Sequence, residues 1–166
     1  MSGRSTMLAA WSRWSKWPAG RRLFSGVVGI VVPYARTIAP QFLEIAPGSA
    51  RVRMKDRRRV RNHLGSVHAA ALFNLGELAA NTALSAAQPS GTRWIVTDTS
   101  IVYVKKARGT LEGIAKLDPV DWSTSHEVVG ESRIVDSGGD VVARLQVKWR
   151  VGPAASASAA RAPSTP

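Results

Sequence analysis

The sequence predicts an α+β domain in which an antiparallel sheet wraps around one long central helix, with a helical extension before it. Residues 67–87 form the longest uninterrupted helical pattern, and nearly all of them are apolar or small. Strand patterns precede this helix as a hairpin and follow it as four further segments. A single apolar helix among so many strands is buried most economically if the sheet curls around it. The length of 166 residues fits one such domain.

Composition and charge limit the classes of function. The chain has a formal net charge of +12, no cysteine and three histidines. Without cysteine there is no disulfide framework, thiolate metal site or cysteine nucleophile, and so few histidines argue against a histidine-rich metal site. The charge favours an anionic partner: nucleic acid, an acidic membrane surface or a phosphate-rich ligand such as coenzyme A. A basic surface that keeps the protein soluble would account for the same charge.

Residues 1–40 are expected to form a basic, tryptophan-rich helical extension. They contain no Asp or Glu, and Trp11, Trp14 and Trp17 recur at a spacing that places them on nearly one face of a helix. We favour packing of this stripe on the protein's own domain or on a sister subunit. The alternative is an amphipathic helix lying on an anionic membrane.

The pair Arg21-Arg22 and the apolar run after it superficially match a twin-arginine export signal. The run is short, contains two glycines and ends at Pro33, so we interpret it as a second short helix of the mature protein. We therefore expect a cytoplasmic protein, with peripheral contact to a membrane as the alternative.

From residue 41 to residue 151 the sequence predicts the main domain. Residues 42–45 and 50–54 flank the turn Pro47-Gly48 and are expected to form a hairpin. The later strands are expected over 94–104, 110–117, 125–135 and 141–151. Residues 152–166 are rich in Pro, Ala and Ser and are expected to form a disordered tail.

The central helix carries one charged residue in its middle, Glu77. An ionised carboxylate in an apolar helix is costly unless it is paired or used. Asn74 and Asn81 lie three residues before it and four after it, so the three polar side chains share one face. That face is either a buried polar stripe or one wall of a reaction site.

The start of this helix is suited to binding an anion or a polarised carbonyl. Gly65 permits a sharp turn, and Ser66 is the expected N-cap. The backbone N–H groups of Val67 to Ala70 would lack intrahelical partners, and small side chains would leave them uncovered. A negative oxygen placed there would meet these donors and the positive end of the helix dipole.

These residues carry a resemblance to a known family. Asn62-x-x-Gly65-Ser66-x-His68-Ala69-Ala70, with Glu77 fifteen positions after the asparagine, resembles the N-x-x-G-T-x-H-G-G…D/E signature of hotdog-fold thioesterases. Within that superfamily it is most similar to the PaaI-like acyl-CoA thioesterases of the phenylacetate pathway, in a less characterised bacterial branch. The resemblance covers roughly residues 21–150 and implies the hotdog fold.

The resemblance also implies an activity, the hydrolysis of a fatty or aryl acyl-CoA thioester, with coenzyme A as part of the substrate and no separate cofactor. Such hydrolysis needs a carboxylate, a positioned water and donors for the developing oxyanion. By resemblance, Glu77 is the general base or nucleophile and Asn62 holds the water or the carbonyl. The N–H of Ala69, after the Gly65 turn, supplies the oxyanion contact, and His68 orients the loop. The family forms this site across a dimer interface, which implies a homodimer or homotetramer.

One departure from the family pattern concerns the strand after the helix. Family members often carry a Ser or Thr seven residues before the strand tyrosine, here Tyr103, and that position is Val96. Either the register shifts by one residue, so that Thr97 supplies the hydroxyl that assists the water, or this hydroxyl is missing. For Glu77 the alternative role is a buried ion pair with a strand arginine such as Arg93. For His68 it is a backbone hydrogen bond at the helix start.

Basic residues near the motif suit the phosphates of coenzyme A as charge-assisted donors. They are Arg57, Arg58, Arg61, Lys105, Lys106 and Arg108, and the other expected substrate contacts are Ser66, Asn74, Asn81 and Thr97. A run of charges is more often a solvated face. Two further functions stay open: a non-catalytic acyl- or lipid-binding protein at a membrane surface and, less favoured, a nucleic-acid-binding module using residues 51–61.

Overall fold

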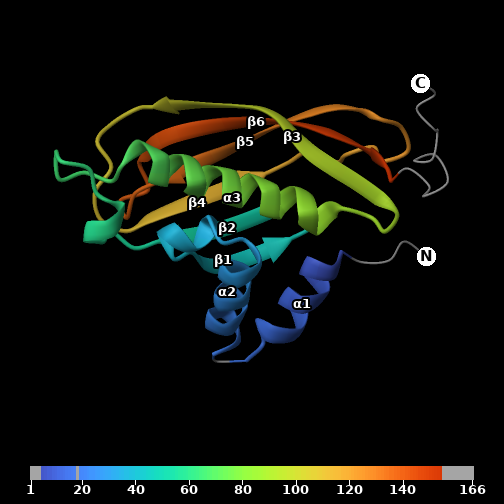
Figure 1. The fold of residues 1–166 in the computed structure, drawn as a ribbon, viewed down its shortest axis with the longest axis horizontal. Helices are drawn as coiled ribbons and strands as arrows, with labels where there is room; N and C mark the ends of the chain where they lie inside the picture. The colour runs from blue at the N-terminus through green and yellow to red at the C-terminus, as the bar shows by residue number, and fades with distance from the viewer. Residues whose placement is uncertain (1–4, 18, 155–166) are drawn as a thin grey trace, which may run out of the picture.

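The computed structural model of the protein describes residues 5–17 and 19–154. Two helices and a 3-10 turn come first, followed by a hairpin, a long helix and four strands (Figure 1). The elements are α1 (Thr6–Trp14), α2 (Gly20–Val31), η1 (Ala35–Ile38), β1 (Gln41–Ala46), β2 (Ser49–Met54), η2 (Arg58–Val60), α3 (Ala69–Ala87), β3 (Thr92–Tyr103), β4 (Leu111–Lys116), β5 (His126–Val135) and β6 (Val141–Pro153).

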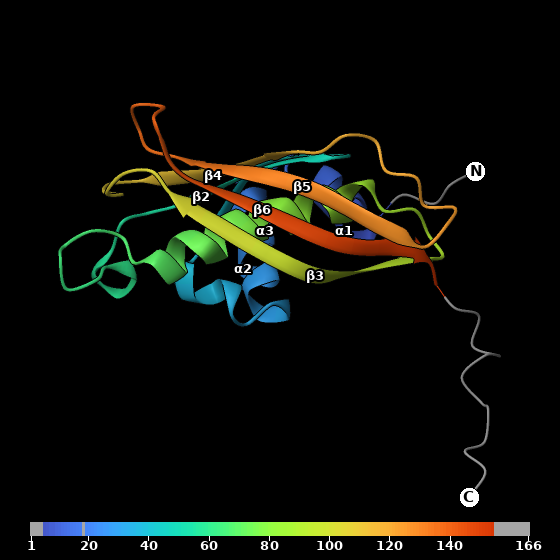
Figure 2. The same ribbon diagram turned by 90° about the horizontal axis from the view of Figure 1, so that it is seen from above.

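The strands form one antiparallel sheet in the order β1-β2-β4-β5-β6-β3, with β1 and β3 at its two edges. Helix α3 lies along one face of this sheet, and β5, β6 and β3 cross over it (Figure 2). The arrangement confirms the predicted α+β fold of an antiparallel sheet around one long helix. The last strand continues to Pro153, past the expected boundary at 151, and residues 155–166 of the expected tail lie outside the described residues.

Close packing of α3 on the sheet depends on small residues. Leu75, Ala79 and Leu84 are fully buried beneath the sheet. A Cβ added at Gly76 would lie 3.0 Å from both Ile134 Cδ1 and Ser132 Oγ. Ser132 Oγ instead donates a hydrogen bond of 2.8 Å to the Gly76 carbonyl. The absence of a side chain at Gly76 therefore lets the helix backbone contact β5 directly.

The N-terminal helices pack against β1 through aromatic rings. Trp11 is buried and meets Phe24 edge-on at 5.2 Å between ring centroids, and Phe24 meets Phe42 at 5.3 Å. Trp14 also contacts Phe24, at 6.2 Å. The predicted tryptophan stripe thus packs on its own domain at two positions. Trp17 lies beyond the end of α1 and is 72% exposed.

Strand β3 forms a long edge of the sheet. Its outward side chains include Ile95 and Val102, which are 65% and 64% exposed. A bulge between Val96 and Asp98 interrupts its pairing with β6. No helix in the described part of the chain is both long and apolar enough to cross a membrane.

Candidate active site

The loop before α3 is organised by the side chain of Asn62. Its Oδ1 accepts hydrogen bonds from the Leu64 N–H at 3.0 Å and from the Ser66 N–H and Oγ at 3.2 Å each. Gly65 occupies the left-handed region at φ +70°, as the expected turn requires. With Oδ1 used inside the loop, Asn62 Nδ2 has no partner among the described residues. It is free to donate to a carbonyl oxygen.

The N-cap of α3 is His68, which corrects the expectation of Ser66. The Ser66 hydroxyl is committed to Asn62, and His68 Nδ1 accepts the Ala70 N–H at 3.0 Å instead. An accepting Nδ1 means that the proton of the neutral ring sits on Nε2. His68 therefore has the backbone role that the sequence left open, and its exposed ring can also contact a ligand.

Only part of the expected set of free amides remains at the helix start. The Val67 N–H donates to the Ala107 carbonyl at 2.9 Å, and the His68 N–H donates to the Val60 carbonyl at 2.7 Å. The exposed Ala69 N–H has no partner in the part of the chain that the structure describes. The helix dipole and this one donor therefore favour a developing negative charge beside Ala69.

Glu77 is a half-buried carboxylate without a cationic partner in the described residues. Burial raises its pKa, and a hydrogen bond from the Asn81 side chain partly opposes the rise. The exposed side chain of Arg93 makes no ion pair with it. The buried salt bridge that the sequence left open therefore does not form within the described residues, and burial leaves the pKa of Glu77 raised.

Asn74, Glu77 and Asn81 of α3 do not act as one face. Asn74 is buried, and its Nδ2 donates to the Tyr34 carbonyl and to Thr37 Oγ1, each at 3.1 Å. Both of its amide hydrogens are thus used to hold the segment around η1 against α3. Asn81 Oδ1 accepts from Trp149 Nε1, so only Asn81 remains beside Glu77. The predicted substrate contact of Asn74 is therefore replaced by a structural one.

A bulge interrupts β3 between Val96 and Asp98, but it does not bring Thr97 into the position of the water-assisting hydroxyl that the sequence raised as one option. Thr97 is the extra residue of the bulge, and its exposed Oγ1 donates to the Lys148 carbonyl at 3.3 Å. Val96 turns inward and packs against the core. Beyond the bulge the inward-facing hydroxyl belongs to half-buried Thr99, on the same face as Ile101. The sequence missed Thr99 because nothing local marks the bulge.

The predicted basic cluster divides into paired and unpaired cations. Arg61 binds Asp56 at 2.7 Å, and Lys105 binds both Asp136 and Asp140, at 2.8 and 2.7 Å. Arg57 Nη2 donates to the Ile38 carbonyl at 2.9 Å. Within residues 5–17 and 19–154, the exposed side chains of the predicted cluster that make neither an ion pair nor a side-chain hydrogen bond are Arg58, Lys106 and Arg108, and the same holds for neighbouring Arg59.

Tyr103 also belongs to this site. Its hydroxyl donates to the Ala69 carbonyl at 3.4 Å, and burial raises its pKa. A cavity of about 210 Å³ lies beside the helix start and is lined by Tyr34, Arg59, His68 and Ala70, among others. This volume is smaller than the roughly 300 Å³ or more of typical ligand pockets.

Comparison with known proteins agrees with this architecture. Residues 20–151 match the family model described as "Domain of unknown function (DUF4442)". The solved structure of the structural genomics target APC5556 is 36% identical, covers 90% of this chain and 98% of its own, and has a TM-score of 0.78. No curated protein matches the chain.

Two more distant structures carry a name that bears on function. The Pseudomonas aeruginosa protein PA5026, described as a probable thioesterase, is 22% identical over 80% of this chain and 95% of its own, with a TM-score of 0.69. The PaaI protein of the E. coli phenylacetic acid degradation operon is 19% identical over 76% of this chain and 88% of its own, with a TM-score of 0.64. These likenesses confirm the hotdog fold of PaaI-like thioesterases.

Proposed function

The chain belongs to the DUF4442 family, and we propose that it is a thioesterase that hydrolyses acyl-coenzyme A with Glu77 as its catalytic carboxylate. The observation that carries this proposal is the state of Glu77: half-buried, raised in pKa and free of any cation in the described residues. Holding an unpaired carboxylate in an apolar helix is costly, and a functional site is where such a cost is expected.

We propose that two chains form each site, and the distance along α3 supports this. Ala69 and Glu77 are eight residues apart, which in an α-helix corresponds to about 12 Å along the axis. A thioester carbonyl bound at Ala69 would lie too far from Glu77 of the same chain for one water molecule to bridge the two. In a homodimer with antiparallel α3 helices, the helix start of one subunit would lie beside Glu77 of the other, giving two identical sites.

Strand β3 is the edge through which we propose that the dimer forms. It is long, its outer edge pairs with no other strand of the described residues, and it exposes Ile95 and Val102. Such an edge is a ready template for pairing with another strand. Antiparallel pairing of β3 with β3 of a second chain would satisfy its backbone groups and bury these side chains. A homotetramer of two such dimers is compatible with this arrangement.

The proposed reaction follows from the groups at the site. The thioester carbonyl oxygen accepts hydrogen bonds from the Ala69 N–H and from Asn62 Nδ2, and the helix dipole stabilises the oxyanion as it forms. Glu77 of the other subunit takes a proton from a water molecule, whose oxygen attacks the carbonyl carbon. The tetrahedral intermediate collapses with cleavage of the C–S bond, and the proton passes from Glu77 to the leaving thiolate.

The cations without ion pairs are the proposed contacts for the phosphates of coenzyme A. Arg58 lies in η2, before the Asn62 loop. Lys106 and Arg108 flank Ala107, whose carbonyl accepts a hydrogen bond from the Val67 N–H. Guanidinium and ammonium groups bind phosphate oxygens by charge-assisted hydrogen bonds. Arg61 and Lys105 already have carboxylate partners, so we assign them to holding these loops together.

Release of free thiol from a panel of acyl-CoA substrates tests this function. Glu77→Gln should lower turnover by about 100-fold or more, because the amide cannot accept the proton of the water. The matched control is Glu127→Gln, an exposed carboxylate on β5. Both variants should unfold at temperatures close to that of the parent or above it. Full turnover by Glu77→Gln would remove the proposed mechanism.

Val96 favours a second candidate function. This inward-facing position carries no hydroxyl, although related enzymes often have a Ser or Thr there to assist the water. A protein that binds acyl-CoA without hydrolysing it is the corresponding alternative. It predicts saturable binding of acyl-CoA, measured by calorimetry, with no thiol release from any member of the panel.

A further inference from the structure

Helix α2 is apolar on both of its sides. One side, with Phe24 and Val28, is buried against the rest of the domain. The other side carries Leu23, Val27 and Ile30, spaced four and three residues apart, which are 59%, 36% and 72% exposed. A surface helix normally turns polar residues to solvent, so this outer side is an apolar face without a partner in the described residues.

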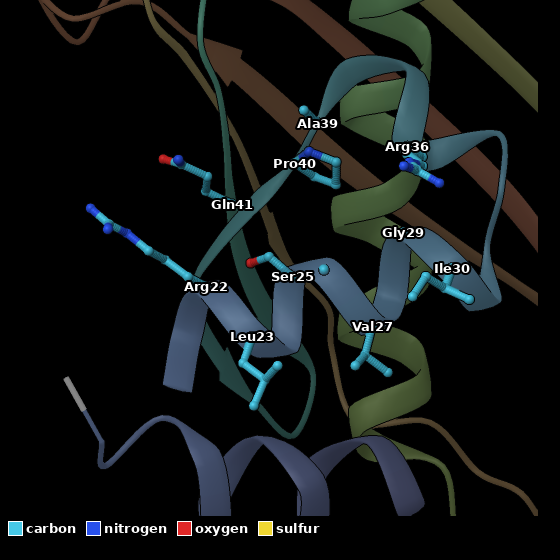
Figure 3. A pocket seen from close by; sticks show the side chains of 11 residues that line it. Arg22, Leu23, Ser25, Val27, Gly29, Ile30, Arg36, Ala39, Pro40 and Gln41 are labelled. Atoms are coloured by element: carbon cyan, nitrogen blue, oxygen red, sulfur yellow. The ribbon is translucent and has the colours of Figure 1, made fainter. Parts of the chain in front are cut away.

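The apolar face extends past both ends of α2. Val31 and Val32 continue it at the C-terminal end, with 73% and 42% exposure, and Trp17 borders a groove with Leu23 at the other end. We call the residues Trp17, Leu23, Val27, Ile30, Val31 and Val32 the α2 surface. An open groove of about 610 Å³ runs along it, where Leu23, Val27 and Ile30 follow one another along the helix (Figure 3).

The charged residues that line the two grooves at the α2 surface, within the part of the chain that the structure describes, are all arginines. Arg22 and Arg36 line the groove toward the two ends of the helix (Figure 3), and Arg13 borders Trp17. The sequence contains no Asp or Glu before Glu44. None of these three arginines forms an ion pair with a residue that the structure describes. Their charge is thus available to an external anion.

We propose that the α2 surface docks the protein onto an anionic lipid bilayer. The apolar side chains would enter the boundary between headgroups and acyl chains, while Arg22 and Arg36 contact lipid phosphates. Because no described helix is long and apolar enough to span a bilayer, the contact is interfacial. This proposal does not depend on hydrolysis.

Charge and topology argue against a second copy of the chain as the occupant. Two α2 surfaces packed together would bring their arginines into proximity, in a protein with a net charge of +12. Helices α1 and α2 lie by β1, whereas the proposed dimer edge is β3, at the opposite end of the strand order (Figure 1). Docking on lipid therefore leaves the β3 edge free.

Flotation with lipid vesicles tests the proposal. The protein should bind vesicles of phosphatidylcholine with phosphatidylglycerol much more strongly than vesicles of phosphatidylcholine alone. The double variant Leu23→Gln and Ile30→Gln should lower the apparent partition coefficient by about tenfold or more, since it removes apolar contact with the bilayer. The matched control is Val129→Gln, a 54% exposed valine on β5, which should bind like the parent.

A second variant separates the role of charge. Arg22→Ser with Arg36→Ser should remove most of the preference for phosphatidylglycerol, while thiol release from acyl-CoA in the absence of vesicles stays unchanged. The proposal is overturned if the parent does not bind the anionic vesicles, or if the Leu23 and Ile30 variant binds them as well as the parent. It is equally overturned if that variant lowers the oligomeric mass of the lipid-free protein, because the α2 surface would then contact a second copy.

Discussion

Trp149 in β6 fixes the orientation of Asn81 in α3. Its Nε1 donates a hydrogen bond of 2.8 Å to Asn81 Oδ1, so the Asn81 amide group is left to face Glu77, one helical turn before it. Trp149 is fully buried, and Asn81 is the acceptor that satisfies its indole N–H. A residue of the core therefore helps to set the proton affinity of the proposed catalytic carboxylate.

Asn81→Ala should shift the pH dependence of activity. The hydrogen bond from Asn81 lowers the pKa of Glu77, so without it that pKa rises further above the ordinary value. Because the base acts in its ionised form, the acid limb of the rate profile should move to higher pH. Stability should also fall by about 1–3 kcal/mol, since the Trp149 N–H loses its acceptor.

Trp149→Phe is the control that separates these two effects. It removes the indole donor but leaves the Asn81 amide next to Glu77, so the loss of stability should come with a smaller shift of the acid limb. Rate profiles of thiol release and urea unfolding curves measure the two quantities. Identical acid limbs in the parent and in Asn81→Ala would contradict the role of Asn81.

The raised pKa of Glu77 also makes stability depend on pH. Its folded-state pKa lies above the unfolded value of about 4.5, so the protonated form is favoured by folding. The contribution of this carboxyl group to the free energy of unfolding is greatest below its pKa in the unfolded state. That contribution is lost as the pH rises through its pKa in the folded state. The glutamine in Glu77→Gln cannot ionise, so this variant does not lose that contribution. As the pH increases from 4 to 7, its free energy of unfolding should therefore rise relative to that of the parent.

Urea unfolding of both proteins at a series of pH values checks this prediction, with Glu127→Gln as the exposed control. The difference between Glu77→Gln and the parent should widen with pH, while the difference for the control should stay nearly constant. A gap that narrows with rising pH would mean that folding favours the ionised carboxylate.

Gly76→Ala should destabilise the protein although alanine is the better helix former. The new Cβ would lie 3.0 Å from Ile134 Cδ1 and Ser132 Oγ and 3.1 Å from Leu145 Cβ, which forces α3 away from the sheet. The expected cost is about 1–3 kcal/mol. In Gly26→Ala the new Cβ meets nothing within 4 Å on α2, and that variant should gain about 0.5–1 kcal/mol. An equal increase in the free energy of unfolding of both variants would contradict the close contact at Gly76.

Much of the fold follows from local patterns. The helical period of apolar residues over 67–87 predicts α3, and the alternation of apolar and polar residues predicts the six strands, each to within a few residues. Burial of one face of a helix or strand imposes these periods. The motif from Asn62 to Glu77 also locates the loop, the helix start and the carboxylate. Each of these features depends on residues close together in the sequence.

What the sequence did not predict depends on contacts between distant residues. Ser66 has the right chemistry for an N-cap, but the Asn62 side chain engages it and His68 takes its place. Lys105 is neutralised by carboxylates more than thirty residues away, Asp136 and Asp140, which no local pattern reveals. Asn74 shares the helical spacing of Glu77, yet it faces η1, which comes about forty residues before it.

The β3 edge gives a prediction about assembly. Val102→Lys should weaken the homodimer, because it places a charge on an exposed apolar position of the proposed interface. Sedimentation velocity should show a shift toward monomer at micromolar concentration, and thiol release should fall with it. Val129→Lys, an equally drastic change on an exposed valine of β5, should leave the mass unchanged. A dimer that persists in Val102→Lys with full activity would place the interface elsewhere.

Subunit mixing tests most directly whether Glu77 of one chain acts with Asn62 of another. Glu77→Gln and Asn62→Ala should each be nearly inactive alone, but a mixed dimer would contain one site with both native residues. After unfolding and refolding together in equal amounts, thiol release should recover to about a quarter of the parent value, since half of the dimers are mixed and each has one intact site. Two inactive variants that stay inactive after mixing, although exchange of labelled subunits is complete, would contradict a site shared between chains.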